Sequence, residues 1–294
     1  MKSIGIVCSD TFEGNALIQE AQLKFNKVIQ INPLKVRFQF KRLNEFPEII
    51  HDNEDLASLN YLLVRATQGK EKAISLLTHS LELCGTKIVD SVKRFPVGKA
   101  SKLLTTVERF KNQSGISTYI CFSKKPTILM LRDVANDFPL LTKPYAGKKS
   151  QDIIKVNNID EAISFTNNFF SKSEKDEPIL FQKYVNFVKE YRAFLVDGKV
   201  IGLVRKGKNR NNILTRRISK GKKVKNTPVS RFVEEKCNNN GILGVDVARD
   251  ENGELYIIEA NRSPQWENFQ KITGANTAEY IINNLLNENL TWNQ

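Results

Sequence analysis

Histidine is nearly absent from this 294-residue sequence, which contains only His51 and His79. Each lies alone, without a nearby nucleophile motif, so histidine-based triads and histidine metal sites are not expected. The four cysteines are far apart and form no CxxC pair, which argues against a zinc site or a disulfide framework and indicates buried free thiols. No P-loop or kinase-type glycine loop occurs, so the phosphoryl-transfer folds built on those loops are disfavoured.

Long apolar runs are also missing. No stretch of about 18 apolar residues could span a bilayer, and the segment 1–8 becomes polar too soon for a signal peptide. Apolar residues make up 40% of the chain and charged residues 26%, as is ordinary for a soluble globular protein. We therefore expect a cytoplasmic protein with no membrane partner.

Acidic residues are outnumbered by basic ones. Forty-five Lys and Arg against 32 Asp and Glu give a formal charge of +13, which favours polyanionic partners such as nucleotides, nucleic acid or acidic protein tails. A prominent share of this charge lies between Arg205 and Lys225. A solvated loop and a phosphate-facing role both fit that stretch.

The first 90 residues alternate short apolar runs with amphipathic stretches, which predicts a parallel α/β unit. Strands are expected at 4–7, 28–31, 61–64 and 87–90, with helices at 16–25 and 71–84.

The rest of the chain mixes helices with paired strands. Asp197-Gly198 between two apolar runs is a strong two-residue hairpin signal. The expected elements are helices at 99–115, 158–170 and 230–237, and strands at 139–144, 153–156, 179–185, 191–196, 200–204, 244–248 and 255–261.

Three oxygen donors lie on the last pair of strands. Asp246 is on one arm of this hairpin, and Glu259 and Asn261 are on the other arm and on the same face, because strand side chains alternate. Both carboxylates interrupt apolar strands, where a carboxylate needs a compensating cation or donor. Two carboxylates and an amide oxygen suit magnesium. An exposed sheet face with polar residues turned outward is the competing interpretation.

The sequence around these donors resembles the signature of the ATP-grasp ligases, nearest to the RimK-like branch that adds glutamate to protein tails. The resemblance is carried by Gly244-Val245-Asp246-Val247, an Asn-Gly turn, and Ile258-Glu259-Ala260-Asn261-Arg262-Ser263-Pro264. It implies that Asp246, Glu259 and Asn261 hold the magnesium ions that bridge the nucleotide phosphates. Mn²⁺ is expected as a substitute metal.

Further site residues follow from the same resemblance. Residues 179–185 resemble the hinge strand of the family, whose backbone pairs with adenine. Lys183 stands where that strand commonly has an acid, so the adenine contact is expected to come from backbone groups. Glu190 is expected to bind the ribose and Arg192 to approach phosphate. The nucleotide-binding set implied is Lys102, Lys143, Gln182, Lys183, Tyr184, Val185, Glu190 and Arg192, and the catalytic set facing the transferred phosphate is Arg192, Arg210 and Asn212.

The resemblance predicts an α/β ATP-grasp fold in three parts. These are an N-terminal parallel α/β domain (1–94), a linker helix with a central lid subdomain (95–186), and a C-terminal antiparallel subdomain with the magnesium site (187–294). ATP is expected between the last two parts. Arg65, at a strand end, fits either an acceptor or phosphate contact or a loop anchor.

The function predicted is ATP-dependent ligation of a carboxylate to an amine through an acyl phosphate, with release of ADP. The substrates would be an amino acid such as glutamate, or another carboxylate, and an amine acceptor on a protein, an acidic peptide tail or a small molecule. The alternatives are a small-molecule kinase that uses the same ATP cleft, and a basic nucleic-acid-binding protein with a degenerate cleft. The basic stretch lacks interleaved aromatics, which disfavours nucleic acid as a partner.

Overall fold

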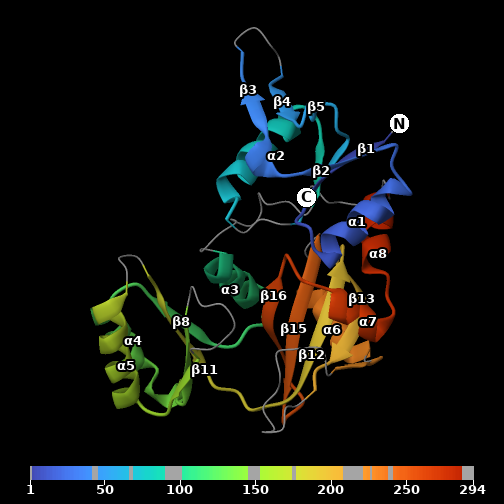
Figure 1. Ribbon diagram of the computed structural model, residues 1–294. Coiled ribbons are helices and arrows are strands. Elements are labelled where there is room, and N and C mark those ends of the chain that lie inside the picture. The colour runs from blue at the N-terminus through green and yellow to red at the C-terminus, as the bar shows by residue number, and fades with distance from the viewer. Residues whose placement is uncertain are drawn as a thin grey trace. The chain divides into compact units, whose positions relative to one another are not determined.

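The computed structural model describes residues 2–41, 46–65, 69–89, 101–144, 153–173, 177–207, 221–225, 227–237 and 241–286. The chain divides into two compact units (Figure 1). The first unit comprises Met1–Ser101, Lys189–Val247 and Glu259–Gln294, and the second comprises Lys102–Val188 and Ala248–Ile258. The three-part division expected from the sequence stays a prediction.

A parallel four-stranded sheet opens the first unit, as the sequence predicts. Its order is β2-β1-β6-β7, with every printed pairing parallel. The strands are β1 (Ser3–Val7), β2 (Lys27–Ile31), β6 (Tyr61–Val64) and β7 (Lys87–Val89), and the helices between them are α1 (Phe12–Gln22) and α2 (Glu71–Leu83). Helix α1 begins where the Thr11 hydroxyl accepts a hydrogen bond from the Gly14 N–H.

A small antiparallel sheet in the same unit escaped the sequence analysis. It has the order β3-β4-β5 and follows a short 3₁₀ helix. The bounds are η1 (Pro33–Lys35), β3 (Arg37–Gln39), β4 (Glu48–His51) and β5 (Glu54–Asp55). Strands of two to four residues give little periodicity to detect.

The C-terminal part of the chain builds a five-stranded sheet in the order β14-β13-β12-β15-β16. Its strands are β12 (Phe187–Val196), β13 (Lys199–Arg205), β14 (Lys222–Lys223), β15 (Ile242–Asp250) and β16 (Leu255–Asn261). The helices of this part are α6 (Thr227–Lys236), α7 (Glu267–Thr273) and α8 (Thr277–Leu285). The Asp197-Gly198 turn has φ values of +48° and +71°, both positive as in a type I′ two-residue hairpin turn.

One hydrophobic core joins the N-terminal sheet to residues of the C-terminal part within the first unit. It contains Ile4 and Ile6 of β1, Leu17 of α1, Phe194 of β12 and Trp266, all fully or almost fully buried. Helices α1 and α8 contact each other, as Figure 1 shows. A second core lies between α2 and the opposite face of the parallel sheet. Within the first unit, the N-terminal sheet and the C-terminal elements therefore share a packed core.

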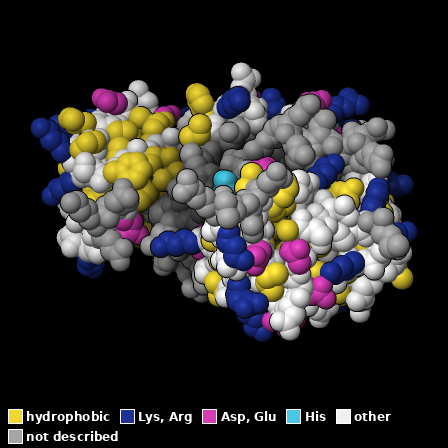
Figure 2. Space-filling model, turned by 90° about the horizontal axis from the view of Figure 1, so that it is seen from above, with side chains coloured by type: hydrophobic (Ala, Val, Ile, Leu, Met, Phe, Trp, Pro, Cys, Tyr) yellow, Lys and Arg dark blue, Asp and Glu magenta, His cyan; other side chains and the backbone are white. Residues whose placement is uncertain are grey.

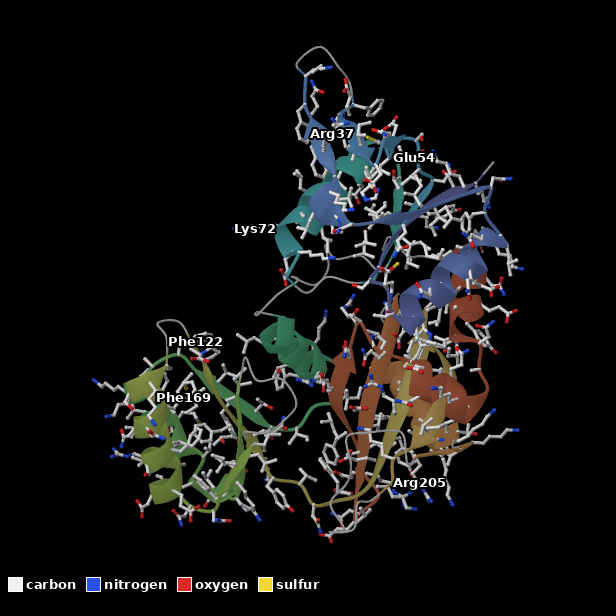
Figure 3. The ribbon with its side chains drawn as sticks, in the orientation of Figure 1. Arg37, Glu54, Lys72, Phe122, Phe169 and Arg205 are labelled. Carbon is white, nitrogen blue, oxygen red and sulfur yellow. The ribbon has the colours of Figure 1, made fainter. Side chains whose placement is uncertain are left out.

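The second unit carries the sheet β10-β9-β11-β8. Its elements are α3 (Ser101–Lys111, beginning one residue before the unit), β8 (Thr118–Cys121), α4 (Lys124–Asp133), η2 (Ala135–Asp137), β9 (Leu140–Pro144), β10 (Ile154–Val156), α5 (Ile159–Lys172) and β11 (Ile179–Lys183). Phe181 of β11 and Leu131 of α4 are completely buried in its core, and Phe169 of α5, labelled in Figure 3, packs against them. The sequence analysis missed β8, α4, α7 and α8.

The mixed α/β class is confirmed, with a parallel sheet near the N-terminus and antiparallel pairings among the later strands. Of the helices in the described ranges, none combines the length and apolar character needed to cross a bilayer. On the face shown in Figure 2, Lys and Arg side chains lie in several separate groups.

Candidate active site

Four charged side chains meet on the five-stranded sheet, and we call them the charged quartet: Glu190, Arg192, Lys206 and Asp246. Arg192 Nη1 lies 3.1 Å from Asp246 Oδ1, and Lys206 Nζ lies 3.1 Å from Asp246 Oδ2 and 3.4 Å from a Glu190 carboxylate oxygen. The side chains are 4–18% exposed. Two carboxylates and two cations therefore share a largely buried site.

The ladder between β12 and β13 explains this meeting. Arg192 pairs with Val204, and the Lys206 N–H donates a hydrogen bond to the Glu190 carbonyl at 2.9 Å, which continues the ladder beyond β13. Because side chains alternate, Glu190 and Arg192 lie on one face, and Lys206 lies on the face opposite to Arg205. Arg205 is exposed and marks the end of β13 in Figure 3.

Gly244 and Asp246 of β15 complete the site from the other side of β12. A Cβ at Gly244 would lie 2.6 Å from Pro264 Cβ and 2.8 Å from Arg192 Cζ, so only glycine leaves room for the guanidinium here. Asp246 Oδ1 is buried and receives no hydrogen bond from the described residues, although Arg192 is near. A buried carboxylate oxygen that faces a cation but accepts no hydrogen bond is a hard donor of the kind that magnesium takes, so the chemistry of Asp246 fits the expected metal.

The other two expected metal ligands lie on the neighbouring strand β16. Glu259 is exposed, and Asn261 is half-buried with its Oδ1 accepting a hydrogen bond from the Ser263 N–H at 2.9 Å. Both are oxygen donors, so their chemistry fits magnesium. Among the described residues, no group of three or more His, Cys, Asp or Glu gathers as a metal cluster. The set of two carboxylates and an amide stays a prediction.

The loop after β16 is tied to the N-terminal part of the first unit. Arg65, at the end of β6, donates from Nη1 to the Arg262 carbonyl at 2.9 Å, and the Ser263 hydroxyl donates to the Arg65 carbonyl. The guanidinium also lies 5.7 Å from the centroid of the Trp266 ring. These contacts favour the loop-anchor interpretation of Arg65, and Trp266 is a core residue, 1% exposed.

Glu13 of α1 is a second anchor, and the sequence analysis missed it. One of its carboxylate oxygens accepts from the Trp266 N–H at 2.9 Å and from the Glu267 N–H at 3.3 Å, at the start of α7. Glu13 thus caps a helix whose first turn is 253 residues further along the sequence. No local spacing signal could have identified it.

In the second unit, backbone N–H groups at the end of the hinge strand β11 and just after it donate hydrogen bonds within the protein. The Lys183 N–H donates to the Ser117 carbonyl at 2.9 Å, and the Tyr184 N–H donates to the Pro139 carbonyl at 3.0 Å. The Val185 N–H makes no hydrogen bond to a described residue. If adenine binds through this backbone, Val185 is the donor that the fold leaves for it.

The side chain of Lys183 in the hinge strand forms an ion pair. Lys183 Nζ lies 2.9 Å from Asp137 Oδ1, and the Tyr119 hydroxyl donates to the same carboxylate. The Tyr119 hydrogen bond and the Lys183 ammonium lower the pKa of Asp137. Burial and the Asp137 acceptor raise the pKa of Tyr119 to about 12. The lysine that replaces the expected hinge acid therefore has its own acidic partner.

Comparisons with known proteins agree with this geometry. Residues 138–281 match the family model described as ATP-grasp domain, R2K clade family 2. This segment is an ATP-grasp domain. The segment holds the charged quartet and the hinge strand, so the family assigned from the sequence is confirmed.

Two curated relatives of this chain are glutamate ligases by name. It is 27% identical over 170 residues to the coenzyme gamma-F420-2:alpha-L-glutamate ligase of Methanococcus maripaludis, covering 51% of this chain and 56% of that protein. It is 23% identical over 287 residues to a probable alpha-L-glutamate ligase of Aliivibrio fischeri, covering 92% and 90%. The chain thus spans little more than half of the first relative.

The ATP-grasp fold extends over nearly the whole chain. The ATP-grasp ligase PsnB, solved with a minimal precursor, Mg and ADP, superposes with a TM-score of 0.68 at 14% identity, covering 97% of this chain and 96% of that one. At this identity the likeness shows the fold.

Four expected site residues of the ATP-grasp domain and its linker lie where the structure describes no side chain. Arg210 and Asn212 lie outside the described residues, and for Lys102 and Lys143 only the backbone is described, in α3 and β9. Gln182 is buried, 8% exposed, and donates to the Thr118 hydroxyl at 2.8 Å. The roles of these residues stay predictions.

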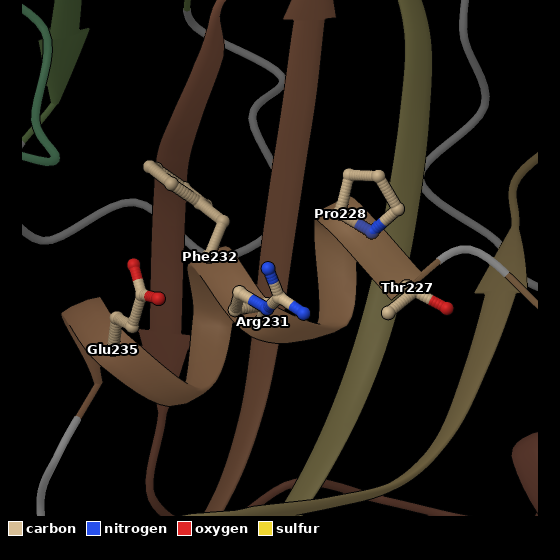
Figure 4. Close-up of a pocket in the computed structure, with 5 residues that line it drawn as sticks. All are labelled: Thr227, Pro228, Arg231, Phe232 and Glu235. Atoms are coloured by element: carbon tan, nitrogen blue, oxygen red, sulfur yellow. The ribbon is translucent and has the colours of Figure 1, made fainter.

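Figure 4 shows a pocket on helix α6 with the side chains that line it. It is lined by residues of this one helix: Thr227, Pro228, Arg231, Phe232 and Glu235. None of the residues expected to bind nucleotide or metal lines it. It is therefore no part of the candidate active site.

Proposed function

We propose that this chain is an ATP-dependent carboxylate–amine ligase that releases ADP and forms an amide bond through an acyl phosphate. The observation that carries the proposal is the charged quartet on the sheet of an ATP-grasp domain. The glutamate-ligase names of the relatives and the ligase structures with the same fold support it.

The chemistry asks for cations and positioning rather than for a side-chain base. Phosphoryl transfer to a carboxylate spreads negative charge over the transferred group, and fixed cations stabilise that charge. The Arg192 guanidinium is held by its ion pair with Asp246, and it packs over Gly244 beside Pro264. The scarcity of histidine in the sequence agrees with such a mechanism.

Magnesium would be held by Asp246, Glu259 and Asn261, and when bound it neutralises charge on the nucleotide phosphates. Asp246 supplies the buried oxygen that lacks a hydrogen bond. Glu190, two residues before Arg192, is the acid proposed for the ribose. The Val185 N–H is the backbone donor proposed for adenine.

We further propose glutamate as the amino-acid substrate and a peptide or protein tail as the other. Glutamate comes from the names of the curated relatives, and a peptide comes from the precursor bound in the solved ligase structure. The formal charge of +13 would attract an acidic acceptor.

The test begins with thermal unfolding of the purified protein with and without Mg-ATP. Wild type should be stabilised by about 2.7 kcal/mol at a ligand concentration of 100 times Kd. Glu259→Gln and Asp246→Asn should lose most of this stabilisation. Glu251→Gln is the control, because Glu251 is an exposed acid in the turn after β15.

ADP release is then measured with glutamate, with an acidic peptide, and with both. Ligation predicts ADP only when the carboxylate and the amine are present together, with a product heavier by one glutamyl residue. ADP formation with one substrate and a phosphorylated product would establish a kinase instead. A wild-type protein that neither binds Mg-ATP nor forms ADP would refute the proposal.

A further inference from the structure

Lys206 has an unusual place for a lysine in a basic stretch. Its side chain is 4% exposed, although the neighbouring Arg205 is exposed. Its Nζ lies between the Asp246 and Glu190 carboxylates, at 3.1 and 3.4 Å. A fully buried lysine is uncommon unless it is paired, so these two acids hold it in place.

The charges of the quartet balance. Glu190 and Asp246 contribute two negative charges, and Arg192 and Lys206 contribute two positive charges. Removal of one member of a partly buried group of this kind leaves an uncompensated charge, which is strongly destabilising. In this structure the chain itself supplies the cation that the Asp246 carboxylate needs.

We infer that Lys206 is an internal counter-ion that competes with a divalent cation for Asp246. The inference rests on the proposed function, because it takes Asp246 as a ligand of that cation. Binding of the metal would require the Lys206 ammonium to leave Asp246 and keep Glu190 as its partner. The free protein should therefore bind a divalent cation weakly in the absence of nucleotide.

Lys206 rather than Arg192 is the cation that yields. Arg192 is confined, because its guanidinium fills the space over Gly244 beside Pro264. Lys206 is a point charge on a flexible stem, and its second partner, Glu190, remains available after Asp246 is lost.

The experiment uses Mn²⁺ alone, without nucleotide, and the variant Lys206→Met. Mn²⁺ binding is measured by electron paramagnetic resonance, and thermal unfolding is measured in EDTA and in excess Mn²⁺. We expect Lys206→Met to bind Mn²⁺ about tenfold more tightly than wild type. It should also melt at a lower temperature in EDTA and recover more stability on addition of Mn²⁺. Lys199→Met is the matched control, because Lys199 is an exposed lysine at the start of β13, the strand that Lys206 directly follows.

A second measurement needs no variant. Acetylation of wild-type lysines, followed by mass spectrometry, should modify Lys206 slowly in EDTA and at least severalfold faster in saturating Mn²⁺. Lys199 should react at the same rate in both conditions. This arm decides the question if Lys206→Met does not fold.

Equal or weaker Mn²⁺ binding by a folded Lys206→Met protein would overturn the inference, as would unchanged acetylation of Lys206. These results are independent of ATP. A wild type that ligates normally while Lys206→Met shows no gain in Mn²⁺ affinity would refute the counter-ion role alone. Failure of wild type to bind or use Mg-ATP would refute the proposed function instead.

Discussion

Replacement of Gly244 by alanine should damage both stability and nucleotide binding. The added Cβ would lie 2.6 Å from Pro264 Cβ and 2.8 Å from Arg192 Cζ, which is closer than real Cβ atoms come to other heavy atoms. Hydrogen bonds from Arg65 to the Arg262 carbonyl and from Ser263 to the Arg65 carbonyl hold the two residues before Pro264 in place. Pro264 therefore has little freedom to move. The Arg192 guanidinium must give way, and its contact with Asp246 is the one that is lost.

The size of the effect follows from these contacts. Overpacking in a well-packed site usually costs about 1–3 kcal/mol. Loss of the Arg192 contact adds to this, but Lys206 still compensates Asp246 at 3.1 Å, so the carboxylate is not left alone. We expect a loss of about 2 kcal/mol, which corresponds to a fall in Tm of roughly 4–8 °C for a unit of this size.

Thermal unfolding with and without Mg-ATP measures both consequences of Gly244→Ala. Gly253→Ala is the control, because Gly253 has a φ of +89° in the β15–β16 turn and open space around it. That change should cost about 1 kcal/mol through backbone strain alone and leave the response to Mg-ATP intact.

A double-mutant cycle with Arg192→Ala tests the mechanism. In that background the guanidinium is absent, so Gly244→Ala should cost at least about 0.5 kcal/mol less than in wild type. Strictly additive losses, or an unchanged Mg-ATP response in Gly244→Ala, would refute the reasoning.

Three further predictions concern other parts of the molecule. Glu13→Ala should lower the free energy of unfolding by about 0.5–2 kcal/mol in urea, because two N–H groups at the start of α7 lose their acceptor; Glu13→Gln keeps an acceptor and should lose less, so equal losses would contradict the cap. The pKa of Asp137 is lowered by the Tyr119 hydrogen bond and by Lys183, so its contribution to stability is complete above its ordinary pKa and is lost as the pH falls through the lowered value. Asp137→Asn should therefore flatten the loss of stability below about pH 4, as followed by circular dichroism; an unchanged pH profile would show that the carboxylate contributes nothing. Burial raises the pKa of the Cys8 thiol to about 11, so Cys8→Ala should leave the number of thiols that react rapidly with Ellman's reagent at pH 8 unchanged and lower by one the total after denaturation.

Local sequence signals predicted the elements that carry their own pattern. The Asp197-Gly198 hairpin is confirmed, and the positive φ at both residues is that of a type I′ turn, which Asp-Gly favours. The parallel strands β1, β2 and β6 are confirmed nearly to the residue, since each is a short apolar run. The helix expected at 16–25 begins earlier, at Phe12, because the Thr11 cap sets its start rather than the apolar periodicity.

Other elements lacked such signals. Strands β3, β4 and β5 are only two to four residues long, which is too short for a clear alternation of apolar and polar residues. Strand β8 is half-buried along its whole length, so it has no such alternation either. Helix α4 begins with two lysines and a proline, which resemble a loop in sequence, although proline is well tolerated in a first helical turn.

The candidate site divides along the same line. Asp246, Glu259 and Asn261 could be selected from sequence because they lie in one short motif on two adjacent strands. Lys206 could not, because a lysine within a basic stretch gives no sign that it turns inward. The β12–β13 ladder places it beside Glu190, and its length lets it reach across β12 to Asp246. Burial therefore gives Lys206 a chemistry that its neighbours in sequence do not share. If Lys206 competes with the metal, the charges of Glu190 and Lys206 beside Asp246, rather than the net charge of the protein, set how tightly Asp246 binds a cation.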